Sequence, residues 1–313
     1  MIAKSFRLSN GFWHKFFPNS NKLFSPQNIP LEIWDIDKRV KENKWKPEIY
    51  CIRNLVFSNN GGQFAIRGGC THGESQFKIY ESDTLNCIGE FVLMEECTNP
   101  KFTNDDKNLI FGTQKGNIYD YSLKEKTLEK LFSLENTIFW LIHHGKHNNK
   151  LYINTSKRTD KGTEYNDDFI LEYDILEKQG NKINLEEKIK PCLFSGLALY
   201  NNKLAIFNRR ALKSETDFQI AEVYAYNIET KKVIYKKEKF NTRNRPIDLN
   251  NCIVWNNRGD KLAFIGLKEI YVIDIDNNNE QVLPFDQPSS VEFSNCDTGI
   301  AIGGDKASLL KIE

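Results

Sequence analysis

One unit recurs along the whole chain, and this repeat constrains the fold more than any other feature of the sequence. Each copy holds a short apolar run, a turn rich in Asn, Asp and Gly, and three further runs of strand length. The clearest copy occupies residues 55–58, 63–69, 76–81 and 86–91, with the turn Asn59–Gly62 after its first run. Apolar runs of about 4–8 residues separated by such turns are typical of antiparallel strands. Copies spaced by about 40–50 residues, without helical runs between the strands, predict the four-stranded blades of a β-propeller.

Seven copies account for nearly the entire chain. The last copy ends after its third run, while residues 2–8 precede the first copy. We expect residues 2–8 to pair as the outer strand of the last blade, because this closes the ring and removes an open sheet edge. The prediction is an all-β chain that forms a single closed β-propeller domain over residues 1–313, with seven four-stranded blades. The predicted blades span approximately residues 11–46, 50–93, 97–133, 136–188, 193–238, 248–285, and 289–313 with 2–8.

Several third runs end on the same kind of residue pair. Trp34–Asp35 is a Trp-Asp pair in this place. The equivalent pairs are Tyr80–Glu81, Tyr173–Asp174, Tyr226–Asn227 and Ile273–Asp274. On these pairs, and on the turns at residues 57–62 and 255–260, the chain resembles the WD-repeat propellers. The Gly-His pair of that family is absent from the copies that align, so its hydrogen-bond network of His, Asp, Ser or Thr, and Trp is not carried over. The resemblance implies a docking platform without catalysis.

Charge and composition narrow the function classes. The 313 residues carry a formal net charge of +1, so no global field draws the chain to nucleic acid or to an anionic membrane. No run approaches the roughly 18 apolar residues of a membrane-spanning helix. The seven cysteines are odd in number and form no Cys-x-x-Cys pair. We therefore expect reduced thiols, neither a zinc knuckle nor a disulfide framework, and a cytoplasmic location.

Catalytic motifs are missing from the sequence. It has no nucleophile elbow, phosphate-binding loop, zinc-protease motif or EF-hand loop. Adjacent carboxylates such as Asp105–Asp106 fall in turns, where we expect them to be solvated. We therefore predict that the protein is not an enzyme and needs no cofactor.

Two groups of residues have an alternative interpretation as reactive sites. His143, His144 and His147 could meet on one metal ion, but a surface turn explains them as well, and we predict no metal site. Cys70 and His72 share a glycine-rich segment, in which a neighbouring imidazole could activate the thiol. A flexible loop is the favoured interpretation of that segment.

The longest insertions in the repeat indicate where a partner would bind. They are expected to be loops at residues 67–75, 157–166, 209–216 and 241–246, all on one face of the propeller. Arginine, which recognises carboxylate and phosphate groups through two parallel hydrogen bonds, is concentrated in these loops, and aromatic residues there could serve as anchors. The predicted partner-binding residues are Arg67, Arg158, Tyr165, Arg209, Arg210, Phe218, Arg243 and Arg245.

Three functions remain as hypotheses. The first is a non-enzymatic scaffold or adaptor that docks a protein with an acidic or phosphorylated surface on this loop face. The second is an enzyme or small-ligand binder with a site at the mouth of the central channel. The mostly apolar first runs of the repeat disfavour that alternative. The third is an accessory or immunity-type protein that binds and inhibits a partner enzyme. In each case we expect a monomer or a subunit of a hetero-complex, without nucleic acid or membrane as partner.

Overall fold

The structure is built from β-strands. This computed structural model describes residues 5–8, 13–25, 30–69, 73–144, 149–158, 165–183, 185, 196–210, 218–243, 251–304 and 307–312. Within these ranges the chain contains 28 strands and no helix, and the strands form seven four-stranded antiparallel sheets. The predicted fold class, a seven-bladed β-propeller, is confirmed.

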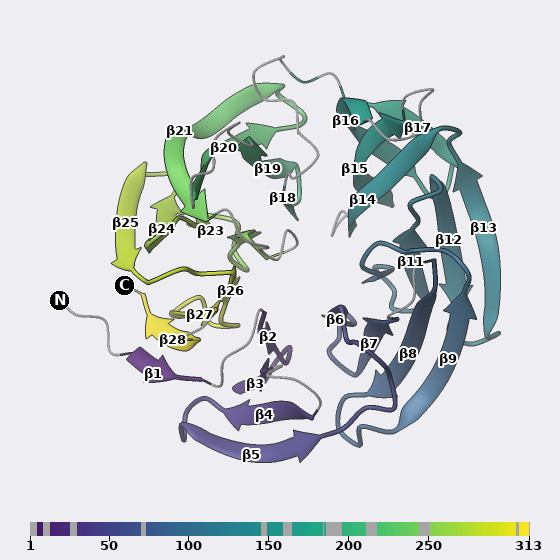
Figure 1. Ribbon diagram of the computed structural model, residues 1–313, viewed down its shortest axis with the longest axis horizontal. Helices are drawn as coiled ribbons and strands as arrows, with labels where there is room; N and C mark the ends of the chain where they lie inside the picture. Colours follow the sequence, from purple (N-terminus) through teal and green to yellow (C-terminus); the bar gives the residue numbers. More distant parts are fainter. Residues whose placement is uncertain are drawn as a thin grey trace. The chain divides into compact units, whose positions relative to one another are not determined.

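The chain divides into two compact units, which are described separately. The middle unit comprises Glu48–Leu193, and the terminal unit comprises Met1–Pro47 together with Phe194–Glu313. Each unit is made of complete blades (Figure 1), because every sheet takes all its strands from one unit.

The middle unit holds blades 2, 3 and 4, whose strands follow one another in the chain. Blade 2 contains β6 (Asn54–Phe57), β7 (Gln63–Gly68), β8 (Ser75–Glu81) and β9 (Cys87–Leu93). Blade 3 contains β10 (Lys101–Phe102), β11 (Asn108–Gly112), β12 (Asn117–Ser122) and β13 (Thr127–Ser133). Blade 4 contains β14 (Thr137–His144), β15 (Lys150–Arg158), β16 (Tyr165–Asp174) and β17 (Gln179–Lys182).

The terminal unit holds blades 1, 5, 6 and 7. Blade 1 contains β2 (Lys15–Phe16), β3 (Lys22–Ser25), β4 (Leu31–Asp35) and β5 (Val40–Trp45). Blade 5 contains β18 (Gly196–Tyr200), β19 (Lys203–Arg210), β20 (Phe218–Asn227) and β21 (Lys232–Arg243). Blade 6 contains β22 (Ile253–Trp255), β23 (Lys261–Ile265), β24 (Glu269–Asp274) and β25 (Asn279–Pro284). Blade 7 contains β26 (Ser290–Phe293), β27 (Gly299–Gly303), β28 (Ser308–Lys311) and β1 (Ser5–Arg7).

Blade 7 therefore combines residues from both ends of the chain. Strand β1 pairs antiparallel with β28, with Ser5 opposite Leu310 and Arg7 opposite Ser308. The pairing continues past the strand, since the Leu8 N–H donates to the Ala307 carbonyl at 2.9 Å. The Leu8 side chain is buried in a cluster with residues of blades 1 and 7.

The turn after each third strand explains the residue pairs that resemble the WD repeat. The Asp35 carboxylate accepts the Lys38 N–H at 2.8 Å, and the Asp274 carboxylate accepts the Asn277 N–H at 3.0 Å. A short polar side chain at this position replaces the backbone partners that the turn lacks. Six of these turns then place a residue with positive φ four positions after the end of the strand, at Arg39, Leu85, Lys126, Lys178, Lys231 and Asn278.

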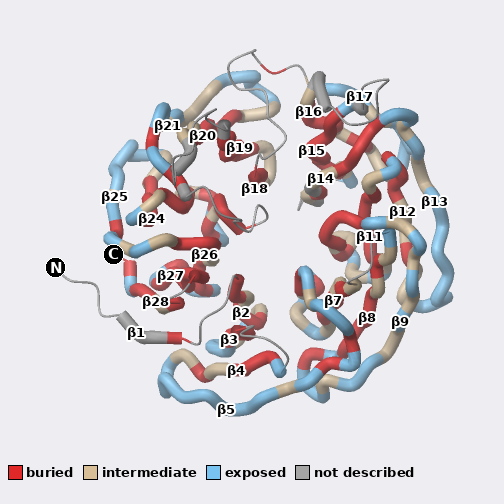
Figure 2. Tube along the Cα trace, in the orientation of Figure 1, coloured by how far each residue is buried: buried red, intermediate tan, exposed pale blue. Residues whose placement is uncertain are grey.

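Aromatic side chains fill the space between blades 2 and 3. The Phe77 ring stacks on Phe91 and on Phe111, with both centroid distances 4.6 Å, and Phe91 also stacks on Tyr121 at 4.3 Å. Such pairs add to the free energy gained by burying the rings. Figure 2 shows the consequence for each blade: inner strands are largely buried, whereas outer strands such as β5 and β13 are mostly exposed.

Candidate interaction surfaces

The structure brings four of the predicted partner-binding residues to one end of blade 5. In the register of this sheet Phe218 lies directly opposite Arg243, and Arg210 lies opposite Ile220. Arg209 precedes Arg210 at the end of β19. We call Arg209, Arg210, Phe218 and Arg243 the arginine end of blade 5.

The expected loop positions are wrong for these residues, which belong to strands. Strands β20 and β21 have 10 and 12 residues, against six in each of β24 and β25 of blade 6. The insertion is thus largely an extension of paired strands. The sequence did not predict this extension because the extended ends of the strands are polar and lack an apolar run. Backbone hydrogen bonds can pair the two strands of a hairpin whatever its side chains are.

Arg209 offers little surface to a partner. Its side chain belongs to the buried set, with 9 % of the residue exposed. Burying a guanidinium is costly unless it is paired, so a charge reversal at Arg209 would disturb the blade itself. The test of binding therefore leaves Arg209 unchanged.

The remaining predicted residues lie in the middle unit or outside the described residues. Arg158 pairs with Tyr165 across the β15–β16 hairpin, so the expected loop here is again shorter than predicted. Arg67 lies within β7, half-buried, and its Nη1 donates to the Cys97 carbonyl at 2.6 Å. That bond ties β7 to the segment before blade 3, which is a structural role. Arg245 lies outside the described residues.

An acidic pocket of about 440 Å³ opens on blades 2 and 3. Its lining comprises Asn60, Gly62, Gln63, Glu81, Asp83, Thr84, Asp105 and Asp106. The sequence placed Asp105–Asp106 on the solvated surface and missed this convergence, which depends on the packing of one blade turn against another. Across the described ranges, no three His, Cys, Asp or Glu side chains are arranged to hold a metal ion.

Asp106 has a structural role at the rim of this pocket. It accepts hydrogen bonds from the Asn59 N–H at 2.6 Å, from Asn59 Nδ2 at 2.8 Å and from the Asn60 N–H at 2.9 Å. Asn59 and Asp106 belong to the first turns of blades 2 and 3, so this clasp joins neighbouring blades. Bonds to a carboxylate are stronger than bonds between neutral groups, which favours a fixed contact.

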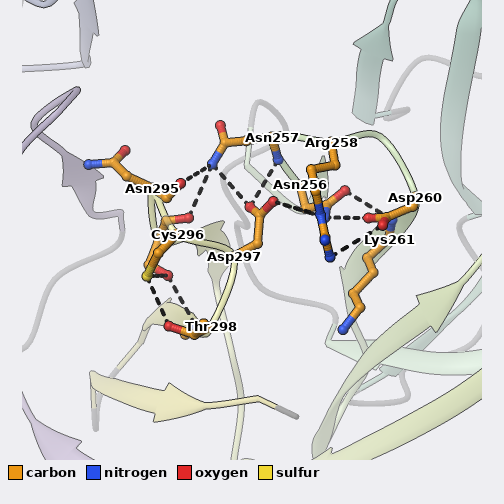
Figure 3. Close-up of polar contacts among 11 residues, drawn as sticks. Asn256, Asn257, Arg258, Asp260, Lys261, Asn295, Cys296, Asp297 and Thr298 are labelled. Atoms are coloured by element: carbon orange, nitrogen blue, oxygen red, sulfur yellow. Dashed lines mark hydrogen bonds and ion pairs between the residues drawn. The ribbon is translucent and has the colours of Figure 1, made fainter.

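The same clasp recurs between blades 6 and 7 (Figure 3). Asp297 accepts the Asn257 N–H at 3.0 Å and Asn256 Nδ2 at 3.1 Å. Asn295, two residues earlier, donates to the Phe17 carbonyl of blade 1 at 2.6 Å. Blades 6, 7 and 1 of the terminal unit are thus linked through their first turns.

The structure places two of the predicted histidine positions in a strand, where a surface turn was expected. His143 and His144 lie in β14, whereas Cys70, His72 and His147 lie outside the described residues. Burial raises the pKa of the Cys97 thiol to about 12, so this cysteine is unreactive.

The expectation of reduced thiols is wrong for Cys51, which is disulfide-bonded. Disulfides are rare in the cytosol, so the cytoplasmic location loses this support and stays a prediction. Among the described residues, no helix has the length and apolar character to cross a membrane.

Comparison with known protein families finds none that matches this chain, and no curated protein matches it.

Proposed function

We propose that this protein is a non-enzymatic interaction module that docks a partner protein at the arginine end of blade 5. The partner presents an acidic or phosphorylated surface there. One observation carries the proposal: strand register gathers Arg210, Phe218 and Arg243 at the same end of one long sheet. Fold alone supports only the coarser statement, since propellers commonly serve as interaction scaffolds.

The chemistry of these residues favours an anionic partner. Arginine is always charged and donates two parallel hydrogen bonds to a carboxylate or a phosphate. An aromatic residue beside it supplies apolar contact area, as interface anchors often do. Residues at the end of a paired strand are also held in place by backbone hydrogen bonds, so less conformational entropy is lost on binding than from a free loop.

The test uses acidic and phosphorylated peptides as probes. Fluorescence polarisation measures the binding of a library of Asp/Glu-rich and Ser/Thr-phosphorylated peptides to the wild type and to the double variant Arg210→Glu/Arg243→Glu. Hydrogen bonds to charged groups contribute about 1.5–3 kcal/mol each, so the variant should bind at least about tenfold more weakly. Binding to the wild type should also weaken as salt is raised.

A matched control comes from the opposite end of the same strand. Lys231→Glu/Lys232→Glu makes the same change in charge beside the Asn227 end of β20, far along β21 from Arg243. The control variant should bind like the wild type, and all variants should unfold at similar temperatures. If no acidic or phosphorylated peptide binds, or if the lysine variant is weakened equally, the proposed function is wrong.

A further inference from the structure

Strand β9 forms the outer edge of blade 2. The strand order of this sheet is β6-β7-β8-β9, and within the described part of the chain no strand pairs with the far side of β9. Its register with β8 places Val92 opposite Gln76 and Glu90 opposite Lys78. An edge strand presents a row of N–H and C=O groups that can pair with another extended chain.

β9 has no lysine, arginine or proline, and its single charged residue is Glu90. Lysine, arginine and proline on an edge strand discourage pairing with a further chain. The sequence of β9, Cys-Ile-Gly-Glu-Phe-Val-Leu, contains none of them. The outer strands of the other six blades each contain at least one, namely Arg7 in β1, Lys41 in β5, Lys130 in β13, Lys182 in β17, Lys232 in β21 and Pro284 in β25.

Two apolar side chains are exposed on and just past β9, next to the charged Glu90. Alternate residues of this strand point outward, and Val92 is 52 % exposed and Met94, just past the strand, 71 % exposed. Phe91 and Leu93 face the other way and pack on the core between blades 2 and 3. A chain laid along β9 would cover part of this apolar surface.

The charge of blade 2 selects the kind of chain. Glu90 and Glu48 both contact the single Lys78, at 3.0 and 3.6 Å, and both remain largely exposed. Residues 48–97 contain seven acidic and three basic residues, a net charge of −4. The acidic residues are Glu48, Glu74, Glu81, Asp83, Glu90, Glu95 and Glu96, and the basic ones are Arg53, Arg67 and Lys78. A basic segment is the complementary partner.

We propose that the β9 edge binds an extended, basic segment of a partner protein, which adds to blade 2 as a fifth strand. A Lys or Arg of that segment lies beside Glu90, and apolar residues two and four positions away lie beside Val92 and Met94. Main-chain hydrogen bonds supply affinity, and alternate side chains supply specificity. This surface takes the opposite charge to the arginine end of blade 5, so it does not depend on the proposed function.

The probe is an acetylated peptide in which Lys and Arg alternate with Val and Thr, matching the 7 residues of β9. Fluorescence polarisation measures its affinity for the full-length protein, and hydrogen exchange locates the contact. Bound peptide should slow exchange in the β9 segment, residues 87–93. A peptide with Glu in place of each basic residue should bind at least about tenfold more weakly.

Backbone pairing is tested with the wild-type protein. Two further peptides carry N-methyl groups on alternate backbone nitrogens, one in each register. Methyl groups in one register block hydrogen bonds to β9, and those in the other register point away from it. One methylated peptide should lose binding and the other should retain it. If both bind equally well, the peptide does not add as a strand and the proposal is wrong.

A protein variant with a matched control completes the test. Val92→Lys places a lysine on β9, as β5, β13, β17 and β21 have, and should abolish binding. Val282→Lys makes the same change on β25, where the valine is 49 % exposed, close to the 52 % of Val92. This control should bind like the wild type. The proposal is wrong if Val92→Lys binds the peptide normally or if the peptide slows hydrogen exchange outside β9. It is also wrong if the β9 edge instead mediates self-association of the protein, which Val92→Lys would remove.

Discussion

At the scale of single residues, folding strongly lowers the pKa of His14, the buried histidine of blade 1. It precedes β2 with 1 % of its surface exposed, and burial lowers its pKa to about 4 from the usual 6.5. The unfolded chain therefore takes up this proton first as the pH falls. Above about pH 6.5, His14 is neutral in both the folded and the unfolded chain, and the free energy of unfolding keeps its full value. As the pH falls from about 6.5 toward 4, the free energy of unfolding decreases progressively, by about 3 kcal/mol in all.

Urea unfolding of the wild type and of His14→Phe between pH 4 and pH 7 checks this prediction. Carboxylates titrate in the same range in both proteins, so the difference between the two profiles isolates His14. The wild type should lose more stability than the variant on acidification. Parallel profiles would contradict the assignment of a neutral, buried His14.

Residues also show which parts of the structure the sequence could predict. The pairs ending in Asp35 and Asp274 correctly predicted the ends of two third strands. The carboxylate accepts a backbone N–H group of the turn that follows, so the residue type at this position can be recognised in the sequence. Cys51 could not be assigned, since spacing along a chain does not reveal which thiols meet. Arg209 was expected in a loop, and its burial depends on a strand extension that has no apolar alternation.

At the scale of elements, the Asn–Asp clasp gives the turn between β10 and β11 a role beyond its own blade. Asp106 satisfies two backbone N–H groups and one amide of the neighbouring blade 2. Replacing Asp106 with alanine leaves those N–H donors with water as their only partner and removes the contact between blades 2 and 3. We expect Asp106→Ala to lower the free energy of unfolding by about 1–3 kcal/mol.

Thermal or urea unfolding measures this loss, with Asp83→Ala as the control. Asp83 lines the same acidic pocket and is exposed, so its replacement should change stability by less than about 0.5 kcal/mol. Equal effects of the two substitutions would show that pocket charge, and not the clasp, determines the stability of this region.

Elements also explain why the site was harder to predict than the fold. Periodicity identifies strands and turns, and it located the blades because every blade repeats the same pattern. An interaction surface depends on what differs between blades: the long hairpin of blade 5, and the absence of lysine, arginine and proline from β9. The second difference is visible in the sequence only once β9 is known to be an outer strand.

At the scale of the whole molecule, residues near the two ends of the chain depend on each other. The terminal unit contains the first 47 residues together with residues 194–313. Lys15 Nζ forms a half-buried ion pair with Glu292 at 2.7 Å, and β1 completes the sheet of β26, β27 and β28. Contacts between remote parts of the sequence therefore hold this unit together, and losing β1 affects more than one strand.

Deletion of residues 1–8 tests this dependence. It removes the partner of β28 and the buried Leu8, whose burial alone contributes about 1.5–3 kcal/mol. The truncated protein should unfold at a lower temperature and aggregate more readily, because β28 becomes an open edge. Differential scanning calorimetry with light scattering measures both effects. A circular permutant that carries residues 1–8 after residue 313 on a short glycine linker restores the strand and should recover the stability. A truncated protein as stable as the full chain would mean that β1 contributes nothing to blade 7.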